Sequence, residues 1–216
     1  MTLRHFLAID DFDLPTWERV IARGIELKAM LRRGERHEPM TGRTLAMLFE
    51  QPSTRTRVAF EVGMSQMGGH ALFLTAADTQ LGRGELVDDA ARVLSEMVDA
   101  VMIRTPDQEK IDAFAAAARI PVINAMSSIQ HPCQILADMQ TFYERNGPIT
   151  GCRVAFVGDG HNMCQSYIMA SKVFGFDLTV ACPEGFEPRT DVLESHGERT
   201  RLSHEPLAAV DGADLV

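Results

Sequence analysis

The sequence contains little cysteine, and none of its apolar runs is long enough to cross a membrane. Its four cysteines include no Cys-x-x-Cys pair, so their spacing does not support a disulfide framework. The longest apolar runs fall far short of the roughly 20 residues that a membrane-spanning helix needs, and no leading apolar stretch resembles a signal peptide. We therefore expect a soluble, cytoplasmic protein whose thiols are reduced and buried. The cysteines are Cys133, Cys152, Cys164 and Cys182.

Positive charge is also scarce. The 21 lysine and arginine residues are outnumbered by 30 aspartate and glutamate residues, which gives a net charge of −9 at pH 7. This balance argues against nucleic acids or anionic membranes as partners, because both require a basic surface. It still allows a small anionic ligand, since the local field of a pocket can oppose the net charge. Only Lys28, Lys110 and Lys172 are lysines. The other basic residues are arginines, whose forks suit carboxylate or phosphate, although GC-rich coding would produce the same bias.

The remaining composition is that of an ordinary globular protein. The chain has 216 residues, 45% hydrophobic and 24% charged, which is enough for one to two domains with a buried core. Helical and strand-like patterns alternate along it. Continuous apolar strands separated by helices predict an α/β fold, a doubly wound parallel sheet with helices on both faces, followed by the start of a second α/β domain. The first part has predicted helices at 14–31, 54–67, 86–97, 108–118 and 132–143, and predicted strands at 44–49, 71–74, 100–103 and 121–124.

A turn-rich gap at residues 146–151 is the clearest boundary signal. Beyond it the alternation restarts, and the last four residues resemble the beginning of another strand. We therefore predict a first domain at 1–146 and an incomplete second domain at 147–216, as expected for a fragment or a shortened protein. The second part has predicted strands at 153–157 and 178–181 and a predicted helix at 162–174.

The turn at 51–57, Gln-Pro-Ser-Thr-Arg-Thr-Arg, lies between a predicted buried strand and a predicted helix. Ligands of open parallel sheets bind beyond the carboxyl ends of the strands, where this turn falls. Ser53 is a natural N-cap, and the N–H groups of Thr54, Arg55 and Thr56 would point outward. With the helix dipole, the hydroxyls and a guanidinium, these groups predict a phosphate-sized anion site. The alternative is a plain serine cap with solvent-exposed arginines, and the full Ser-Thr-Arg-Thr-Arg run after a buried strand disfavours it.

Two further groups are predicted at the same edge of a sheet. Arg104 directly follows the predicted strand 100–103. The run His-Pro-Cys-Gln at 131–134 repeats the strand–loop–helix arrangement, because Pro132 suits the first helical position. His131 could donate a hydrogen bond to a carbonyl oxygen, and Gln134 could bind an amide-like group. Each residue alone would be an ordinary surface or cap residue, and only their combination with Arg55 favours function.

These motifs together resemble the aspartate/ornithine carbamoyltransferase family. The resemblance rests on 53–57, Arg104 and 131–134, and segment 154–163 resembles the opening of the family's second domain. Cys133, Thr-Gln-Leu-Gly at 79–82 and Asn162-Met163 place the chain nearer the ornithine branch than the aspartate branch. The resemblance extends over essentially the whole chain. It implies transfer of the carbamoyl group of carbamoyl phosphate to the δ-amine of L-ornithine, giving citrulline and phosphate in arginine metabolism, with no cofactor and no metal.

The resemblance also implies roles for individual residues. Ser53, Thr54, Arg55 and Thr56 would hold the phosphate, and Arg104 would bridge the phosphate and the carbonyl oxygen. The catalytic residues would be Arg55, Arg104, His131 and Gln134. The substrate-binding residues would be Ser53, Thr54, Arg55, Thr56, Gln80, Arg104, His131, Pro132, Cys133, Gln134 and Asn162.

Within this implied set, His131 would hydrogen-bond the carbonyl oxygen and Gln134 the carbamoyl NH2. Asn162 would contact the backbone groups of ornithine, and Gln80 would help complete the site across a trimer interface, so that the assembly would be a homotrimer or a multiple of trimers. Residues 57 and 61, an arginine and a glutamate, are expected to form an ion pair that supports the fold.

Other interpretations remain open at this point. Gly158-Asp-Gly160 after a strand partly matches a dinucleotide-binding turn, but Met163 occupies the third glycine position. His161 and Cys164 could share a metal, although two ligands alone are more often packing residues. His161 also stands where the family commonly has a second asparagine. The chain could instead be a non-catalytic module that binds phosphate or carbamoyl phosphate, or a transferase for a related amine such as acetylornithine or putrescine.

Overall fold

The computed structural model describes residues 3–75, 77 and 84–216, and the chain folds into two compact units. Unit one comprises Met1–Leu7 and Glu26–Ser128, and unit two comprises Ala8–Ile25 and Ile129–Val216. Helix α1 (Leu14–Arg32) contributes to both, and α5 (Pro132–Asn146) belongs to unit two. The predicted boundary after residue 146 is based on turn-forming residues in the sequence, whereas these units are defined by which residues pack together. The two divisions differ for that reason, and the boundary stays a prediction.

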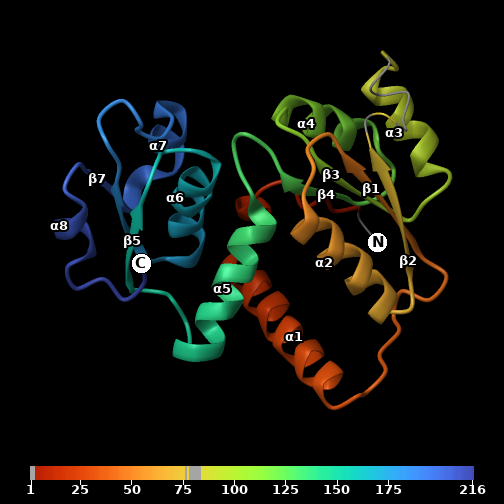
Figure 1. Cartoon of the computed structure of the whole chain (residues 1–216), viewed down its shortest axis with the longest axis horizontal. Helices are drawn as coiled ribbons and strands as arrows, with labels where there is room; N and C mark the ends of the chain where they lie inside the picture. The colour runs from red at the N-terminus through yellow and green to blue at the C-terminus, as the bar shows by residue number, and fades with distance from the viewer. Residues whose placement is uncertain (1–2, 76, 78–83) are drawn as a thin grey trace. The chain divides into compact units, whose positions relative to one another are not determined.

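Unit one is built on a four-stranded parallel sheet in the order β2-β1-β3-β4 (Figure 1). Helices follow the strands along the chain, as a parallel sheet requires. The strands are β1 (Thr44–Phe49), β2 (His70–Thr75), β3 (Ala100–Arg104) and β4 (Val122–Met126). The helices are α2 (Thr54–Gln66), α3 (Val87–Ser95) and α4 (Gln108–Ala117).

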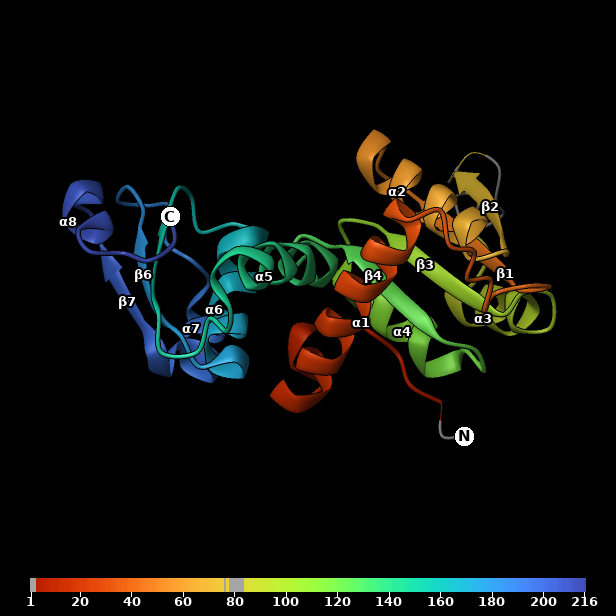
Figure 2. The ribbon, with the colours of Figure 1, turned by 90° about the horizontal axis from the view of Figure 1, so that it is seen from below.

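Strand β1 lies at the centre of two hydrophobic cores. On one face of the sheet, Met47 and Phe49 pack with Met64 of α2. On the other face, Ala46 and Leu48 pack with buried residues of α3 and α4. Successive side chains of a strand point to opposite faces, so an uninterrupted apolar run is what a strand covered on both sides needs. The predicted α/β fold with helices on both faces is confirmed, and Figure 2 shows it from a second direction.

Unit two contains a three-stranded parallel sheet in the order β5-β6-β7. Helices α6 and α8 lie on opposite sides of this sheet (Figures 1 and 2). The predicted strand at the end of the chain is present as a parallel bridge between Leu215 and Val154. The strands are β5 (Arg153–Val157), β6 (Asp177–Ala181) and β7 (Thr200–Ser203). The helices are α6 (Asn162–Phe174), α7 (Thr190–His196) and α8 (Pro206–Val210), with 3-10 turns η1 (Ile9–Asp11) and η3 (Gly197–Arg199).

The segments that sequence patterns missed are short and mostly exposed. Strand β7 has four residues, none of them buried, and α7 and α8 have seven and five residues. Such segments carry too few apolar residues to show a period of two or 3.6. Over residues 3–75, 77 and 84–216, every helix is too short or too polar to span a lipid bilayer.

Gly160, in the loop between β5 and α6, lies against the backbone of a distant loop. Its N–H donates to the carbonyl oxygen of Phe186 at 2.7 Å. A Cβ atom at Gly160 would lie 2.1 Å from the backbone nitrogen of Pro188. Because the obstructing atoms belong to the main chain, a side chain here cannot be accommodated by a rotamer change.

We expect Gly160→Ala to lower the free energy of unfolding by about 1–3 kcal/mol, the usual cost of overpacking. Gly63→Ala is the matched control, because Gly63 lies inside α2 and a methyl group added there would have no neighbouring atom within 4 Å. Alanine should raise helix stability there by about 0.5–1 kcal/mol. Urea unfolding followed by circular dichroism measures both changes, and equal midpoints for the two variants would contradict the prediction.

Candidate active site

The amino end of α2 forms the corner predicted to bind an anion. Ser53 is the N-cap, and its Oγ accepts a hydrogen bond from the Thr56 N–H at 3.3 Å and donates to Thr56 Oγ1 at 3.0 Å. The N–H groups of Thr54 and Arg55 are the first two of the helix, so they have no acceptor within it. They point along the helix axis beyond the end of β1, where the helix dipole favours negative charge. Ser53, Thr54, Arg55, Thr56 and Arg104 are called the α2 corner below.

Arg104 joins the α2 corner from the carboxyl end of the neighbouring strand β3. Its Nη1 lies 3.4 Å from Thr56 Oγ1 and 3.5 Å from the carbonyl oxygen of Ala125, both at the outer limit of hydrogen-bond distance. Its Nε is buried and has no hydrogen-bond partner among the described residues. A buried donor without an acceptor is rare in folded proteins and usually marks a place for a ligand, ion or water.

The two arginines of the corner repel each other. Burial, and then the charge of Arg55, lower the pKa of the Arg104 guanidinium below its ordinary value. Within the described part of the chain, neither guanidinium has a carboxylate partner. Two guanidiniums, one of them with a buried unsatisfied Nε, and two helix N–H groups together favour an anion, and the fork of arginine suits phosphate oxygens. The geometry therefore supports the predicted phosphate-sized site.

Sequence reasoning missed the residues that tie β1 to β3 behind this corner. The Glu50 N–H donates to the carbonyl oxygen of Arg104 at 2.9 Å, and its carboxylate accepts from the Thr105 hydroxyl. Lys110 Nζ lies 2.6 Å from Glu50 Oε1, and both side chains are partly buried. These bonds fix the backbone on each side of the corner. A glutamate directly after a buried strand was a possible signal, but its partners are 55 and 60 residues away.

The predicted ion pair between Arg57 and Glu61 is confirmed, with Nε 2.9 Å from Oε1. The Arg57 guanidinium also stacks over the ring of Phe73, 3.7 Å from its centroid. These contacts direct Arg57 away from the α2 corner, toward β2. Arg57 therefore supports the packing of α2, which leaves Arg55 as the helix arginine of the anion site.

In unit two, Ser166 connects two of the predicted substrate-binding residues. His131 caps α5, and its N–H donates to Ser166 Oγ at 2.8 Å. Ser166 Oγ in turn donates to the carbonyl oxygen of Asn162, the first residue of α6, at 2.6 Å. The serine is almost completely buried. The sequence did not single out Ser166, because a serine inside a helix is usually unremarkable.

Gln134 is held by a partly buried acid on the next turn of α5. Its Nε2 donates to Asp138 Oδ1 at 2.9 Å, and the Tyr167 hydroxyl donates to Asp138 Oδ2 at 3.1 Å. Burial raises the pKa of the Asp138 carboxyl, and the two hydrogen bonds oppose that change. Pro132 occupies the first turn of α5, as predicted. Burial raises the pKa of the Cys133 thiol to about 12, so this cysteine is a neutral thiol at pH 7.

The predicted site residues thus fall into two groups. The α2 corner belongs to unit one, while His131, Pro132, Cys133, Gln134 and Asn162 belong to unit two. Within each unit the structure brings its group together. Gln80 lies outside the described residues. No cluster of three or more histidine, cysteine, aspartate or glutamate side chains suited to a metal occurs in the part of the chain that the structure describes.

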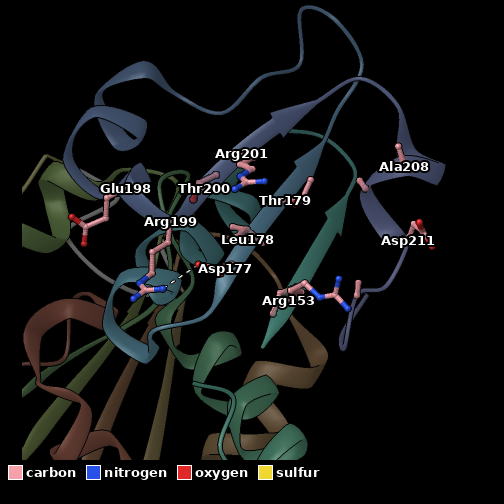
Figure 3. Close-up of a pocket in the computed structure, with 13 residues that line it drawn as sticks. Arg153, Asp177, Leu178, Thr179, Glu198, Arg199, Thr200, Arg201, Ala208 and Asp211 are labelled. Carbon is pink, nitrogen blue, oxygen red and sulfur yellow. Dashed lines mark hydrogen bonds and ion pairs between the residues drawn. The ribbon is translucent and has the colours of Figure 1, made fainter. Parts of the chain in front are cut away.

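A cavity of about 330 Å³ lies elsewhere in unit two (Figure 3). Arg153, Asp177 and Thr200, which line it, are the first residues of β5, β6 and β7. Arg199 and Asp177 form an ion pair at its wall, with Arg199 Nη1 3.0 Å from Asp177 Oδ1. The cavity therefore opens at the amino ends of the strands, opposite to the edge where ligands of parallel sheets bind. None of the predicted site residues lines it.

Family models match the chain along nearly its whole length. Residues 4–144 match the aspartate/ornithine carbamoyltransferase carbamoyl-P binding domain, and residues 150–216 match the Asp/Orn binding domain of the same family. The ornithine carbamoyltransferase of Halorhodospira halophila is 53% identical over 99% of this chain and 71% of its own length. The anabolic ornithine carbamoyltransferase of Pseudomonas aeruginosa is 52% identical over the whole chain and 71% of its own length.

Solved structures give the same result. The ornithine carbamoyltransferase of Burkholderia thailandensis has a TM-score of 0.95 and 44% identity, covering 99% of this chain and 74% of that protein. The enzyme from Pyrococcus furiosus has a TM-score of 0.93 and 42% identity, covering 98% of this chain and 70% of that protein. This chain belongs to the aspartate/ornithine carbamoyltransferase family.

Proposed function

We propose that the chain is an ornithine carbamoyltransferase, which transfers the carbamoyl group of carbamoyl phosphate to the δ-amine of L-ornithine and forms citrulline and phosphate. The observation that carries this proposal is the α2 corner, where Arg55 and Arg104 lie near a capped helix end. Among the described residues neither arginine has a carboxylate partner, and the buried Nε of Arg104 has no hydrogen-bond partner. Relatives about half identical over the whole chain bear the name of this activity. Their anabolic members support a place in arginine biosynthesis.

The reaction needs no protein nucleophile. The neutral δ-amine of ornithine attacks the carbamoyl carbon, a C–N bond forms, and the C–O bond to phosphate breaks. The amine loses a proton, which the departing phosphate takes up as hydrogen phosphate. Cys133, with its raised pKa, is suited to packing and not to attack. The rate gain then comes from holding two substrates in line and from donors directed at the developing oxyanion.

Each group of residues has a part in that scheme. Ser53, Thr54, Arg55 and Thr56 hold the phosphate, and Arg104 bridges the phosphate and the carbonyl oxygen. Among the described residues neither guanidinium has a carboxylate partner, so both are available to the phosphate. Negative charge builds up on the phosphate oxygen as the C–O bond breaks, and the α2 corner therefore stabilises the leaving group most at that point.

The residues of unit two act on the other end of the substrate. His131 donates to the carbonyl oxygen, Gln134 binds the carbamoyl NH2, and Asn162 contacts ornithine. Pro132 and Cys133 shape the first turn of α5, between His131 and Gln134. In this proposal residues 1–146 form the carbamoyl-phosphate-binding domain, and residues 147–216 begin the ornithine-binding domain. The family model for residues 4–144 supports the first assignment.

We also propose that the protein works in the cytoplasm as a homotrimer or a multiple of trimers. Gln80 would then complete the site of a neighbouring subunit. Its small substrates and its acidic net charge support a protein with no nucleic acid or membrane partner.

Arg55→Ala should reduce kcat/KM for carbamoyl phosphate more than Gln134→Ala does, because it removes a cation that binds the phosphate, whereas Gln134→Ala removes only a hydrogen bond to the carbamoyl NH2. Loss of a single such donor typically costs about 10²–10³ in rate, so we expect Arg55→Ala to exceed that range. Arg92→Ala is the matched control, since this arginine is exposed and pairs with neighbours on α3. Steady-state kinetics near wild type for Arg55→Ala would contradict the assignment.

Isothermal titration with carbamoyl phosphate, followed by a colorimetric citrulline assay, tests the reaction itself. We expect wild-type chain to bind carbamoyl phosphate and to form citrulline with ornithine faster than it carbamoylates acetylornithine or putrescine. Binding without any turnover would instead favour a non-catalytic module. Turnover with another amine alone would reassign the second substrate.

Mixing Gln80→Ala and Arg55→Ala subunits should restore part of the activity, because some hybrid sites would contain neither substitution. The measurement is the citrulline rate after the two variants are denatured together and refolded. Mixed assembly is checked by mass spectrometry on subunits of different isotope content. No recovery in confirmed hybrids would reject shared sites.

A further inference from the structure

The end of strand β4 has an unusual backbone. Met126 has φ of 151°, and it is the only non-glycine residue with positive φ among those that the structure describes. Side chains with a Cβ atom rarely adopt this region, which is almost reserved for glycine. Strain of this kind persists only when the surrounding structure fixes it, and it concentrates at functional sites.

Asn124 fixes the strained residue. Its side chain is fully buried, and its Oδ1 accepts from the Met126 N–H at 2.9 Å. Its Nδ2 donates to the carbonyl oxygen of Leu7 at 2.9 Å, so the amide cannot turn away. On the other side, Gln108 Oε1 accepts from Ser127 Oγ at 2.6 Å and lies 3.4 Å from Asn124 Nδ2. Hydrogen bonds therefore fix both the Asn124 side chain and the two residues that follow Ala125.

The strain lies directly opposite Arg104. The pairing of β3 with β4 is regular up to Ile103 and Asn124, and then it shifts so that Arg104 pairs with Met126. One extra residue, Ala125, is therefore taken up in β4, as in a β-bulge. The peptide between Ala125 and Met126 gives its N–H to Asn124 and places its carbonyl oxygen 3.5 Å from Arg104 Nη1. The Met126 carbonyl oxygen accepts from the Thr105 N–H at 3.2 Å.

We propose that Asn124 is a positioning residue that uses the strained backbone of Met126 to aim the Ala125 carbonyl at Arg104, and thereby orients the guanidinium for carbamoyl phosphate. The inference rests on the proposed function, because it concerns the same anion site. Asn124 touches no substrate in this scheme. It acts through the orientation of one peptide group, which a relaxed Met126 would turn away from Arg104.

A rescue experiment separates this role from simple packing. Asn124→Ala removes the acceptor that holds the Met126 N–H, and we expect it to weaken carbamoyl phosphate binding about tenfold in isothermal titration. Asn124→Ala combined with Met126→Gly should regain most of the affinity, because glycine adopts positive φ without help. Met126→Gly alone should bind as wild type does and melt at a higher temperature.

Met126→Val provides a second test that leaves the buried asparagine in place, in case Asn124→Ala does not fold. A β-branched residue disfavours positive φ more than methionine does, so this variant should bind carbamoyl phosphate more weakly than Met126→Gly. A merely structural role predicts a different outcome, in which the double variant shows no recovery of affinity. Unchanged affinity in folded Asn124→Ala, or equal affinities for Met126→Val and Met126→Gly, overturns the inference.

Arg55→Ala in the same titration distinguishes this inference from the proposed function. Weak binding by Arg55→Ala together with normal binding by Asn124→Ala overturns the role of Asn124 alone. Absence of carbamoyl phosphate binding by the wild-type chain overturns the proposed function and removes the basis of this inference with it.

Discussion

The site in unit one depends on a half-buried guanidinium that lacks a counterion among the described residues. Burial alone disfavours the charge of Arg104, and the neighbouring Arg55 adds repulsion. An arginine keeps its proton under these conditions, so a bound anion would stabilise its charge. In the proposed function a phosphate dianion would relieve both contributions at once, which would allow an acidic protein to select an anionic substrate.

The sheet of unit one holds Arg104 in this unfavourable environment through bonds at the carboxyl ends of its strands. β1, β3 and β4 are parallel neighbours, so their carboxyl ends meet at one edge. Glu50 links the first two ends through the Arg104 carbonyl, Thr105 and Lys110. The strained turn at Met126 links the third. Long-range bonds of this kind fix the backbone that carries Arg104.

Much of the fold could be predicted from the sequence because the apolar strands are continuous and the helices are long enough to show their period. The helix at 54–67, for example, differs from α2 by one residue. The predicted helix at 132–143 continues to Asn146, since the chain reaches a glycine able to end it only at Gly147. Strand β7 and helices α7 and α8 were not predicted, because four to seven mostly exposed residues carry no readable pattern.

The sequence by itself determined the parallel α/β fold and the chemistry of the motifs, since a serine cap, a helix end and arginines after a buried strand are local features. Only the tertiary structure decided which groups support them. Glu50 pairs with Lys110 across 60 residues of sequence. Ser166 accepts a hydrogen bond from the His131 N–H across 35 residues, and Asn124 donates one to the Leu7 carbonyl oxygen across 117. Local propensity carries no information about such pairs, because the sheet register and helix packing bring them together only after the whole unit has folded.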